Sequence, residues 1–180
     1  MLVNLKCILD EAYKNYYAVG SFNGYNFETF KGIVEAGAET NTPVILAFGA
    51  KYLPNMSVET AAAMAKSLSE EVSIPVCLHL DHCKDQGVVY RALKAGFGSV
   101  MYDGSALPFE ENLQNTLDVC RVAHACGASV EAELGSLAAG ERSHEGSAED
   151  VEAYTDPEAA LDRKEREESG RSGVLWGWGG

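Results

Sequence analysis

An acid and an imidazole stand side by side at the end of an apolar segment. Pro75 opens this segment, mainly apolar residues follow, and the segment ends in Asp81 and His82. The pattern predicts a buried strand. Ionisable groups are costly to bury unless they are paired or bind a metal. Neutral histidine is a common zinc ligand, and a neighbouring carboxylate can coordinate, orient or carry a proton. The structural alternative is a strand-end histidine beside an aspartate that caps the next helix.

Two further carboxylates stand at the ends of later apolar segments. Asp103 follows 99–102, and Glu133 closes 129–133. One imidazole and two carboxylates at neighbouring strand ends could form part of a zinc site. Taken singly, Asp103 also suits a turn, since Asp-Gly-Ser is good turn chemistry, and Glu133 could be a rim residue.

The elements that would position these side chains alternate strictly between strands and helices. Apolar periodicity, N-cap residues and the placement of proline and glycine predict them. We expect strands at 17–22, 44–48, 75–82, 99–102 and 129–133, and helices at 5–16, 27–40, 58–72, 85–95 and 108–126.

Strict alternation with short connections indicates parallel strands built from βαβ units, hence the α/β class. An open doubly wound sheet would often carry a glycine-rich phosphate turn after its first strand, but the turn here is Asn23-Gly24-Tyr25-Asn26. A (β/α)8 TIM barrel instead gathers its chemistry at the carboxyl ends of several strands, where polar residues stand in this chain. We therefore favour the barrel. Such barrels typically take ~250 residues, so 180 residues should hold the first five to six βα units.

Composition limits the partners and the compartment that can be expected. The chain is 46% hydrophobic and 23% charged, and its formal net charge is -13, which argues against a nucleic-acid surface or a basic membrane anchor. The N-terminus does not read as a signal peptide, and no stretch approaches the ~20 apolar residues of a membrane helix. Five cysteines without C-x-x-C spacing indicate reduced thiols in a cytoplasmic protein.

Five motifs together resemble the class II, zinc-dependent ketose-bisphosphate aldolases of the fructose- and tagatose-bisphosphate type. The likeness covers the chain from its start to about Ala160. The motifs are His79-Leu80-Asp81-His82, Gly98 to Ser105, Pro108 to Asn112, Val130 to Gly135, and Tyr17 to Asn23.

The resemblance implies reversible cleavage of a ketose 1,6-bisphosphate into dihydroxyacetone phosphate and glyceraldehyde 3-phosphate. It implies that Asp81 is the acid/base at the C4 hydroxyl and that His82 binds the catalytic zinc, a Lewis acid for the ketose carbonyl. Asp103 and Glu133 would serve a second, alternative metal position. From its place in the strand, we expect His79 to pack or to support the site. The implied partner is a small phosphorylated sugar, and the implied assembly is a homo-oligomer.

The chain departs from the family pattern in three respects. The family completes its zinc site with two later histidines and binds phosphate on later loops, whereas His124 is expected mid-helix and His144 in a polar loop. Gly49 stands where many relatives carry a phosphate-binding serine. The alternative reading is therefore an inactive truncated fragment of such an enzyme. A remoter alternative is a barrel lyase that forms an imine through Lys51 or Lys84.

Residues 161–180 fit the family least. A run of mixed charge passes into glycine and tryptophan, with no strand-length apolar run and no core-forming pattern. We expect 1–160 to be the N-terminal part of an aldolase barrel and 161–180 to be a tail foreign to the fold, either disordered or the product of a frameshift or truncation.

Overall fold

A computed structural model describes residues 1–134, 156–169 and 174–176. The helices are α1 (Leu5–Lys14), α2 (Phe27–Thr40), the 3-10 turn η1 (Ala50–Tyr52), α3 (Val58–Glu70), α4 (Gln86–Ala95), α5 (Phe109–Ala125) and α6 (Pro157–Ser169). The strands are β1 (Ser21–Asn23), β2 (Val44–Gly49), β3 (Val76–Cys83), β4 (Ser99–Tyr102), β5 (Ser129–Ala132) and β6 (Val174–Trp176).

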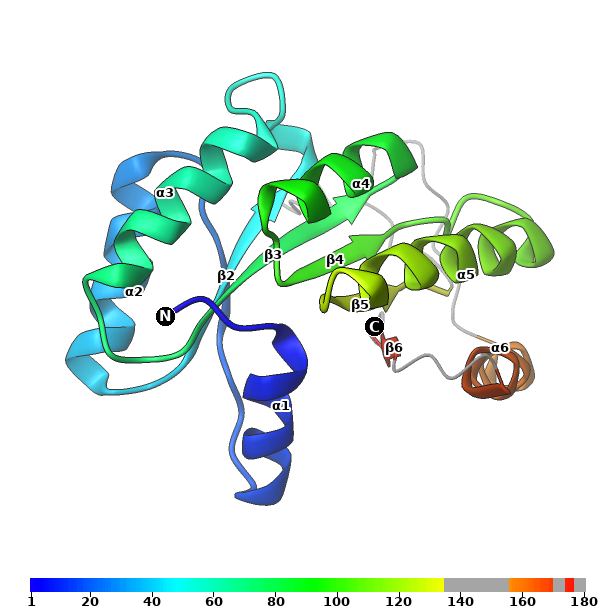
Figure 1. Cartoon of the computed structure of the whole chain (residues 1–180). Coiled ribbons are helices and arrows are strands. Elements are labelled where there is room, and N and C mark those ends of the chain that lie inside the picture. Colours follow the sequence, from blue (N-terminus) through cyan, green and yellow to red (C-terminus); the bar gives the residue numbers. More distant parts are fainter. Residues whose placement is uncertain (135–155, 170–173, 177–180) are drawn as a thin grey trace, which may run out of the picture.

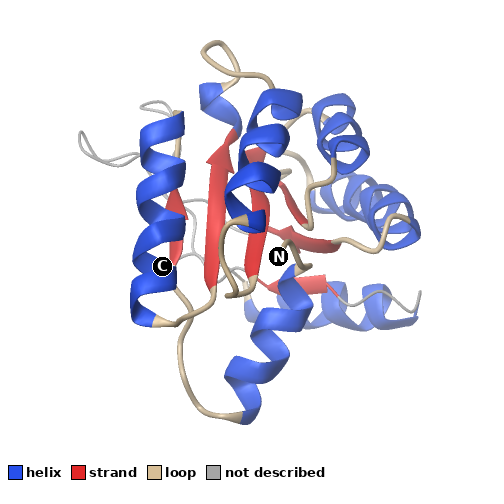
Figure 2. Ribbon diagram, turned by 60° about the vertical axis from the view of Figure 1, so that its left-hand side comes forward, coloured by secondary structure: helices blue, strands red, loops and turns tan. Residues whose placement is uncertain are grey.

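The six strands form one parallel sheet in the order β1-β2-β3-β4-β5-β6 (Figure 1). An open doubly wound sheet reverses its strand order at a switch point, and this sheet does not. The sequential order is that of a barrel wall, in which each strand lies beside its predecessor. Figure 2 shows the strands as a curved wall with helices along its outer side.

The two faces of the sheet bury different things. Outward residues of the strands pack with α2 to α5 in the main core, with Leu46, Leu78 and Val100 among its fully buried members. On the inner face α1 covers the amino ends of the strands, where Ile8 contacts a small cluster that includes Cys77. Side chains at alternate positions share a face, so the inner column of β3 runs from Cys77 upward to Asp81.

Local signals in the sequence explain where the helices begin and end. Asn26 accepts a hydrogen bond from the amide of Thr29 in a capping box, and Ser57 caps α3 in a similar way. The Asp85 side chain accepts from two amides at the start of α4, and that helix ends at Gly96 with a φ of 104°. Glycine adopts this left-handed conformation at little cost.

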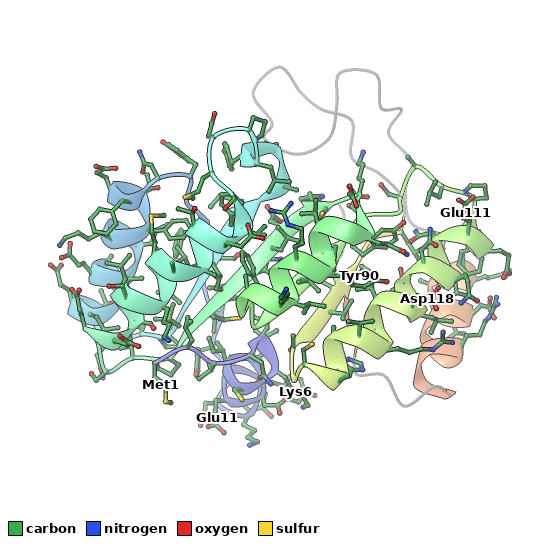
Figure 3. All side chains as sticks on the ribbon, turned by 45° about the horizontal axis from the view of Figure 1, so that its top comes forward. Met1, Lys6, Glu11, Tyr90, Glu111 and Asp118 are labelled. Carbon is green, nitrogen blue, oxygen red and sulfur yellow. The ribbon has the colours of Figure 1, made fainter. Side chains whose placement is uncertain are left out.

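Helices α2 to α5 pack side by side in chain order along the outer face. Tyr90 of α4 and Asp118 of α5 lie near one another where the two helices run together (Figure 3). Among the described residues, no helix has both the length and the apolar character needed to cross a membrane.

Several predicted boundaries were wrong by a few residues. Helix α1 ends at Lys14 rather than residue 16, because Tyr16 takes a φ of 56° and leaves the helix. Strand β1 was predicted at 17–22 but spans Ser21–Asn23, since only these residues pair with β2. Helix α3 stops at Glu70, short of residue 72, and β5 stops one residue before Glu133.

A short sixth strand lies within 161–180, the segment that we expected to be foreign to the fold. Val174–Trp176 pairs in parallel with β5, because three apolar residues suffice to extend an edge whose backbone groups would otherwise lack partners. Helix α6 precedes this strand, and Arg166 forms two 2.9 Å hydrogen bonds with the Glu110 carboxylate of α5. A domain boundary at residue 160 stays a prediction.

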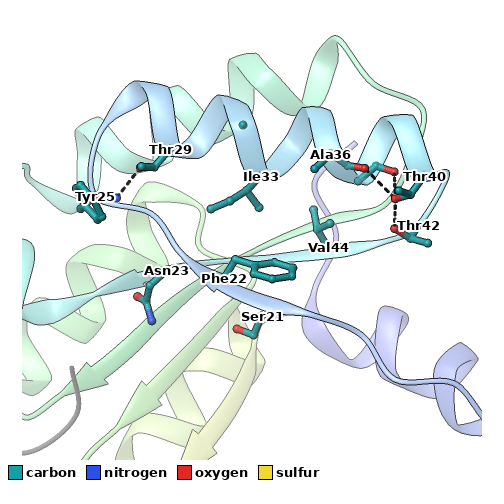
Figure 4. Close-up of a pocket in the computed structure, with 12 residues that line it drawn as sticks. Ser21, Phe22, Asn23, Tyr25, Thr29, Ile33, Ala36, Thr40, Thr42 and Val44 are labelled. Carbon is teal, nitrogen blue, oxygen red and sulfur yellow. Dashed lines mark hydrogen bonds between the residues drawn. The ribbon is translucent and has the colours of Figure 1, made fainter. Parts of the chain in front are cut away.

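The other end of the sheet is open. Within the described residues β1 pairs only with β2, and a groove runs between its outer face and α2. Figure 4 shows Phe22 of β1 and Ile33 of α2 on the walls of this groove. The Phe22 side chain is 52% exposed, so the groove is an uncovered apolar surface.

Candidate metal and active site

An irregularity in β3 brings Asp81 and His82 to the same face. Strand β3 pairs Leu80 with Val100 and Cys83 with Tyr102, so three residue steps on β3 match two on β4. The extra residue makes a bulge, a feature that re-aims side chains. His82 has a φ of 47° at this point, an unusual conformation for a residue with a side chain. Regular alternation would place Asp81 and His82 on opposite faces, and the bulge places both at the mouth.

His82 meets the two later carboxylates that the sequence singled out. Its Nδ1 lies 3.4 Å from Asp103 Oδ2 and 3.5 Å from Glu133 Oε2. One donor atom from each of the three residues lies within 4.8 Å of the other two. The ends of β3, β4 and β5 therefore converge as the sequence predicted.

The carboxylates around His82 favour a positive charge at the centre of the cluster. The hydrogen bond from His82 to Asp103 raises the pKa of His82 to about 9 against the opposing effect of burial, with Asp81 and Glu133 contributing. Burial alone would raise the pKa of Asp103, but hydrogen bonds from His82 and Ser105 outweigh it and hold this pKa at about 2. Three carboxylates thus face one imidazole at the mouth.

Asp81 is held from the other side. Asn23, at the end of β1, donates from Nδ2 to Asp81 Oδ2 at 2.9 Å. Asp81 Oδ1 lies 4.0 Å from His82 Nε2, too far for a hydrogen bond. The sequence marked Asn23 as a polar strand end, but not its contact with Asp81.

The backbone beside Glu133 is fixed by a residue that sequence reasoning missed. Asn112, fully buried in the first turns of α5, donates from Nδ2 to the Glu133 carbonyl at 3.0 Å. Gly104 leaves room for it, because a Cβ there would lie 2.3 Å from Asn112 Oδ1. The feature of the sequence that could have indicated this role is a polar residue, Asn112, at an inward-facing position of α5.

Comparison with known proteins assigns the family. A sequence model described as "Fructose-bisphosphate aldolase class-II" matches residues 3–168. The chain belongs to the class II fructose-bisphosphate aldolase family. It is 46% identical over 138 residues to the fructose-bisphosphate aldolase of Helicobacter pylori, covering 76% of this chain and 45% of that one. It is 41% identical over 132 residues to the sulfofructosephosphate aldolase of Alkalicoccus urumqiensis, covering 73% and 46%.

The crystal structure of the YdjI aldolase from Escherichia coli K12 supports the same assignment. It matches with a TM-score of 0.76 and 32% identity, covering 92% of this chain and 58% of that one. The predicted barrel class is confirmed, and this aldolase-family chain spans about half the length of the curated relatives that it matches.

The remaining predicted residues lie away from the cluster or outside the described range. His124 lies in the last turn of α5, and His144 falls outside the described residues. Lys51, whose Nζ lies 5.1 Å from the centre of the Tyr52 ring, is exposed, as is Lys84. Imine-forming lysines are commonly desolvated, so the exposure of both gives the imine alternative no support.

The donor set fits a divalent metal ion such as zinc. Imidazole nitrogen and carboxylate oxygens are zinc ligands. Asp103 and Glu133 are 7% and 8% exposed, and buried carboxylates need a paired cation or a metal. The raised pKa of His82 favours its protonated form beside these acids, and a bound metal would take the place of that proton, since a ligand histidine must be neutral. His82 Nδ1 lies within 3.5 Å of an oxygen of each acid, and the assignment of His82 to one metal position and of Asp103 and Glu133 to another stays a prediction.

Proposed function

We propose that the intact protein is a metal-dependent aldolase that reversibly cleaves a ketose 1,6-bisphosphate, fructose or tagatose, into dihydroxyacetone phosphate and glyceraldehyde 3-phosphate. The observation that carries this proposal is the placement of the Asp81 carboxylate beside a compact His-Asp-Glu cluster formed by His82, Asp103 and Glu133. A proton carrier next to a metal site is what a class II aldol cleavage requires.

Each residue has a separate task in this proposal. Asn23 holds Asp81 Oδ2, so Asp81 Oδ1 is the oxygen that takes the proton of the C4 hydroxyl as the C3–C4 bond breaks, and returns it in the reverse direction. His82, Asp103 and Glu133 would hold zinc. The bound ion would supply a Lewis acid for the ketose carbonyl and neutralise developing charge.

The remaining parts of the proposal concern partners and place. The substrate is a small phosphorylated sugar, in keeping with the names of the relatives. The structure describes all five cysteines, and each is a free thiol, as expected of a protein that works in the reducing cytoplasm in carbohydrate metabolism. The intact protein would be a homo-oligomer.

Metal titration tests the cluster. Co²⁺ replaces zinc in many sites and reports coordination through visible absorption, so it serves as the probe. We expect the purified chain to bind Co²⁺ with displacement by Zn²⁺, and His82→Ala to weaken binding by about 10-fold or more. His124→Ala, in the last turn of α5, is the matched control and should bind like the wild type. Equal binding by His82→Ala and the wild type would refute the cluster as the metal site.

A cleavage assay tests the chemistry. Fructose 1,6-bisphosphate and tagatose 1,6-bisphosphate are supplied separately, and triose phosphate formation is followed with and without EDTA. For the intact protein, we expect cleavage that EDTA abolishes and Zn²⁺ restores. Cleavage that persists in EDTA and is trapped by borohydride would instead support an imine mechanism.

A further inference from the structure

A second histidine-centred group lies on the same three strands below the metal cluster. His79 of β3 is 4% exposed, and its Nδ1 lies 2.9 Å from the hydroxyl of Ser99 on β4. Its Nε2 lies 3.5 Å from Glu131 Oε2 on β5. The mechanism proposed above does not use this buried imidazole, so its position calls for another explanation.

The imidazole lies at the last regular inward pair before the bulge. His79 is the direct register partner of Ser99, the outward pair Leu80 and Val100 follows, and the ladder then shifts before Cys83. Asp81 and His82 occupy the shifted part. Because a one-residue slip of a strand moves every side chain to the other face, the position of the bulge decides whether His82 reaches the mouth.

The protonation state of His79 suits one accepted and one donated hydrogen bond. Burial is the main cause that lowers the pKa of His79 to about 4, partly opposed by Asp81, so the ring is neutral near pH 7. A neutral ring can accept at one nitrogen and donate at the other. Ser99 Oγ–H can then donate to Nδ1, while Nε2–H points to the Glu131 carboxylate. Glu131 stands two residues before Glu133 on the same face of β5.

We propose that His79 is a positioning residue that fixes the register of β3 against β4 directly below the bulge. The hydrogen bond between His79 and Ser99 fixes the position of the bulge along β3. The contact between His79 and Glu131 links this part of β3 to β5 as well. His82, Asp103 and Glu133 are thereby kept at ligand spacing. The inference rests on the proposed metal function of His82, Asp103 and Glu133.

Four variants separate positioning from packing. His79→Leu keeps bulk and removes both nitrogens. His79→Asn keeps an acceptor at the position of Nδ1, within reach of Ser99, whereas His79→Gln carries its amide one carbon further out. Cys77→Ala, on the same face two residues below and fully buried, loses packing without touching the hydrogen bond between His79 and Ser99 and is the matched control.

Two readouts are taken on the full chain, Co²⁺ affinity from visible absorption and hydrogen exchange of a peptide spanning 79–84. We expect His79→Leu and His79→Gln to bind Co²⁺ about 10- to 100-fold more weakly and to exchange faster across the bulge. His79→Asn should restore both readouts toward wild type. Cys77→Ala should lower the unfolding temperature and leave Co²⁺ affinity unchanged.

The outcomes distinguish the two proposals. Failure of the wild type to bind Co²⁺ would overturn the metal function, and exchange across 79–84 would still decide the role of His79. Wild-type binding with equal affinity and exchange in His79→Leu would overturn the positioning role alone. If Cys77→Ala weakens Co²⁺ as much as His79→Leu does, the effect is general loosening and the proposal is wrong.

Discussion

Asp81 and His82 are neighbours in the chain but have different partners, so substituting each of them should impair a different property of the site. Asp81 is bonded to Asn23, whereas His82 contacts the two acids of the cluster. Asp81→Asn keeps the shape of the side chain and an acceptor for Asn23, but an amide cannot take up the hydroxyl proton. In the intact protein, we expect cleavage to fall by about 100-fold or more, with Co²⁺ affinity unchanged.

The control for that variant is Asp10→Asn, an exposed acid on α1 paired with Lys6. It should leave cleavage and metal affinity as in the wild type. Loss of Co²⁺ binding in Asp81→Asn would instead place Asp81 among the ligands, and full activity in Asp81→Asn would remove it from the mechanism.

His79 predicts an acid-sensitive fold. Its folded pKa of about 4 lies below the ordinary 6.5, so between these values the unfolded chain binds more protons than the native one, and stability rises with pH. The contribution of about 3 kcal/mol is complete above pH 6.5 and is lost as pH falls toward 4. Urea unfolding at a series of pH values should show this slope, and His79→Asn should flatten it. An unchanged slope in His79→Asn would contradict the prediction.

At the scale of the elements, periodicity predicted most of the structure. The bounds of α2 and β4 agree with the sequence prediction, and those of β2, α4 and α5 agree within a residue or two, because caps, prolines and apolar stripes act locally. The mouth residues were predicted from their places at strand ends. The bulge in β3 was not, since it depends on pairing with β4. The ties made by Asn112 and Asn23 were missed for the same reason, because their partners are distant in sequence.

The turn after β4 offers a test of how α5 supports the site. A Cβ at Gly104 would lie 2.3 Å from Asn112 Oδ1, and Asn112 is held by its bond to the Glu133 carbonyl. Gly104→Ala should therefore destabilise the fold by about 1–3 kcal/mol and weaken Co²⁺ binding by displacing Glu133. Urea unfolding and the cobalt titration measure both.

A glycine with open surroundings supplies the control. A Cβ at Gly32, within α2, would meet no atom within 4 Å, so Gly32→Ala should stabilise by about 0.5–1 kcal/mol through helix propensity. Destabilisation by both substitutions to the same extent would show that the Gly104 effect is unrelated to Asn112.

At the scale of the whole molecule, the sheet is a partial barrel wall whose inner face changes in polarity along the strands. Its inner face is apolar at the amino ends, where α1 covers Cys77, and increasingly polar toward His79 and then Asp81. The relatives are about twice as long as the matched region. Within the described residues the β1 edge and the groove beside α2 have no covering element. Unpaired parallel edges with apolar flanks promote association between chains.

We expect this open edge to drive self-association of the chain as given, measured as an apparent mass that rises with concentration in light scattering. Phe22→Lys places a charge on the edge strand, a common means of blocking edge pairing, and should lower the apparent mass. Tyr13→Lys is the matched control, because Tyr13 is an aromatic residue of α1 that is 85% exposed and lies off the sheet. Lowering by both variants would point to general surface hydrophobicity, and a monomeric wild type would show that the edge is already protected. Selective lowering by Phe22→Lys would identify the β1 edge as the surface through which the chains associate.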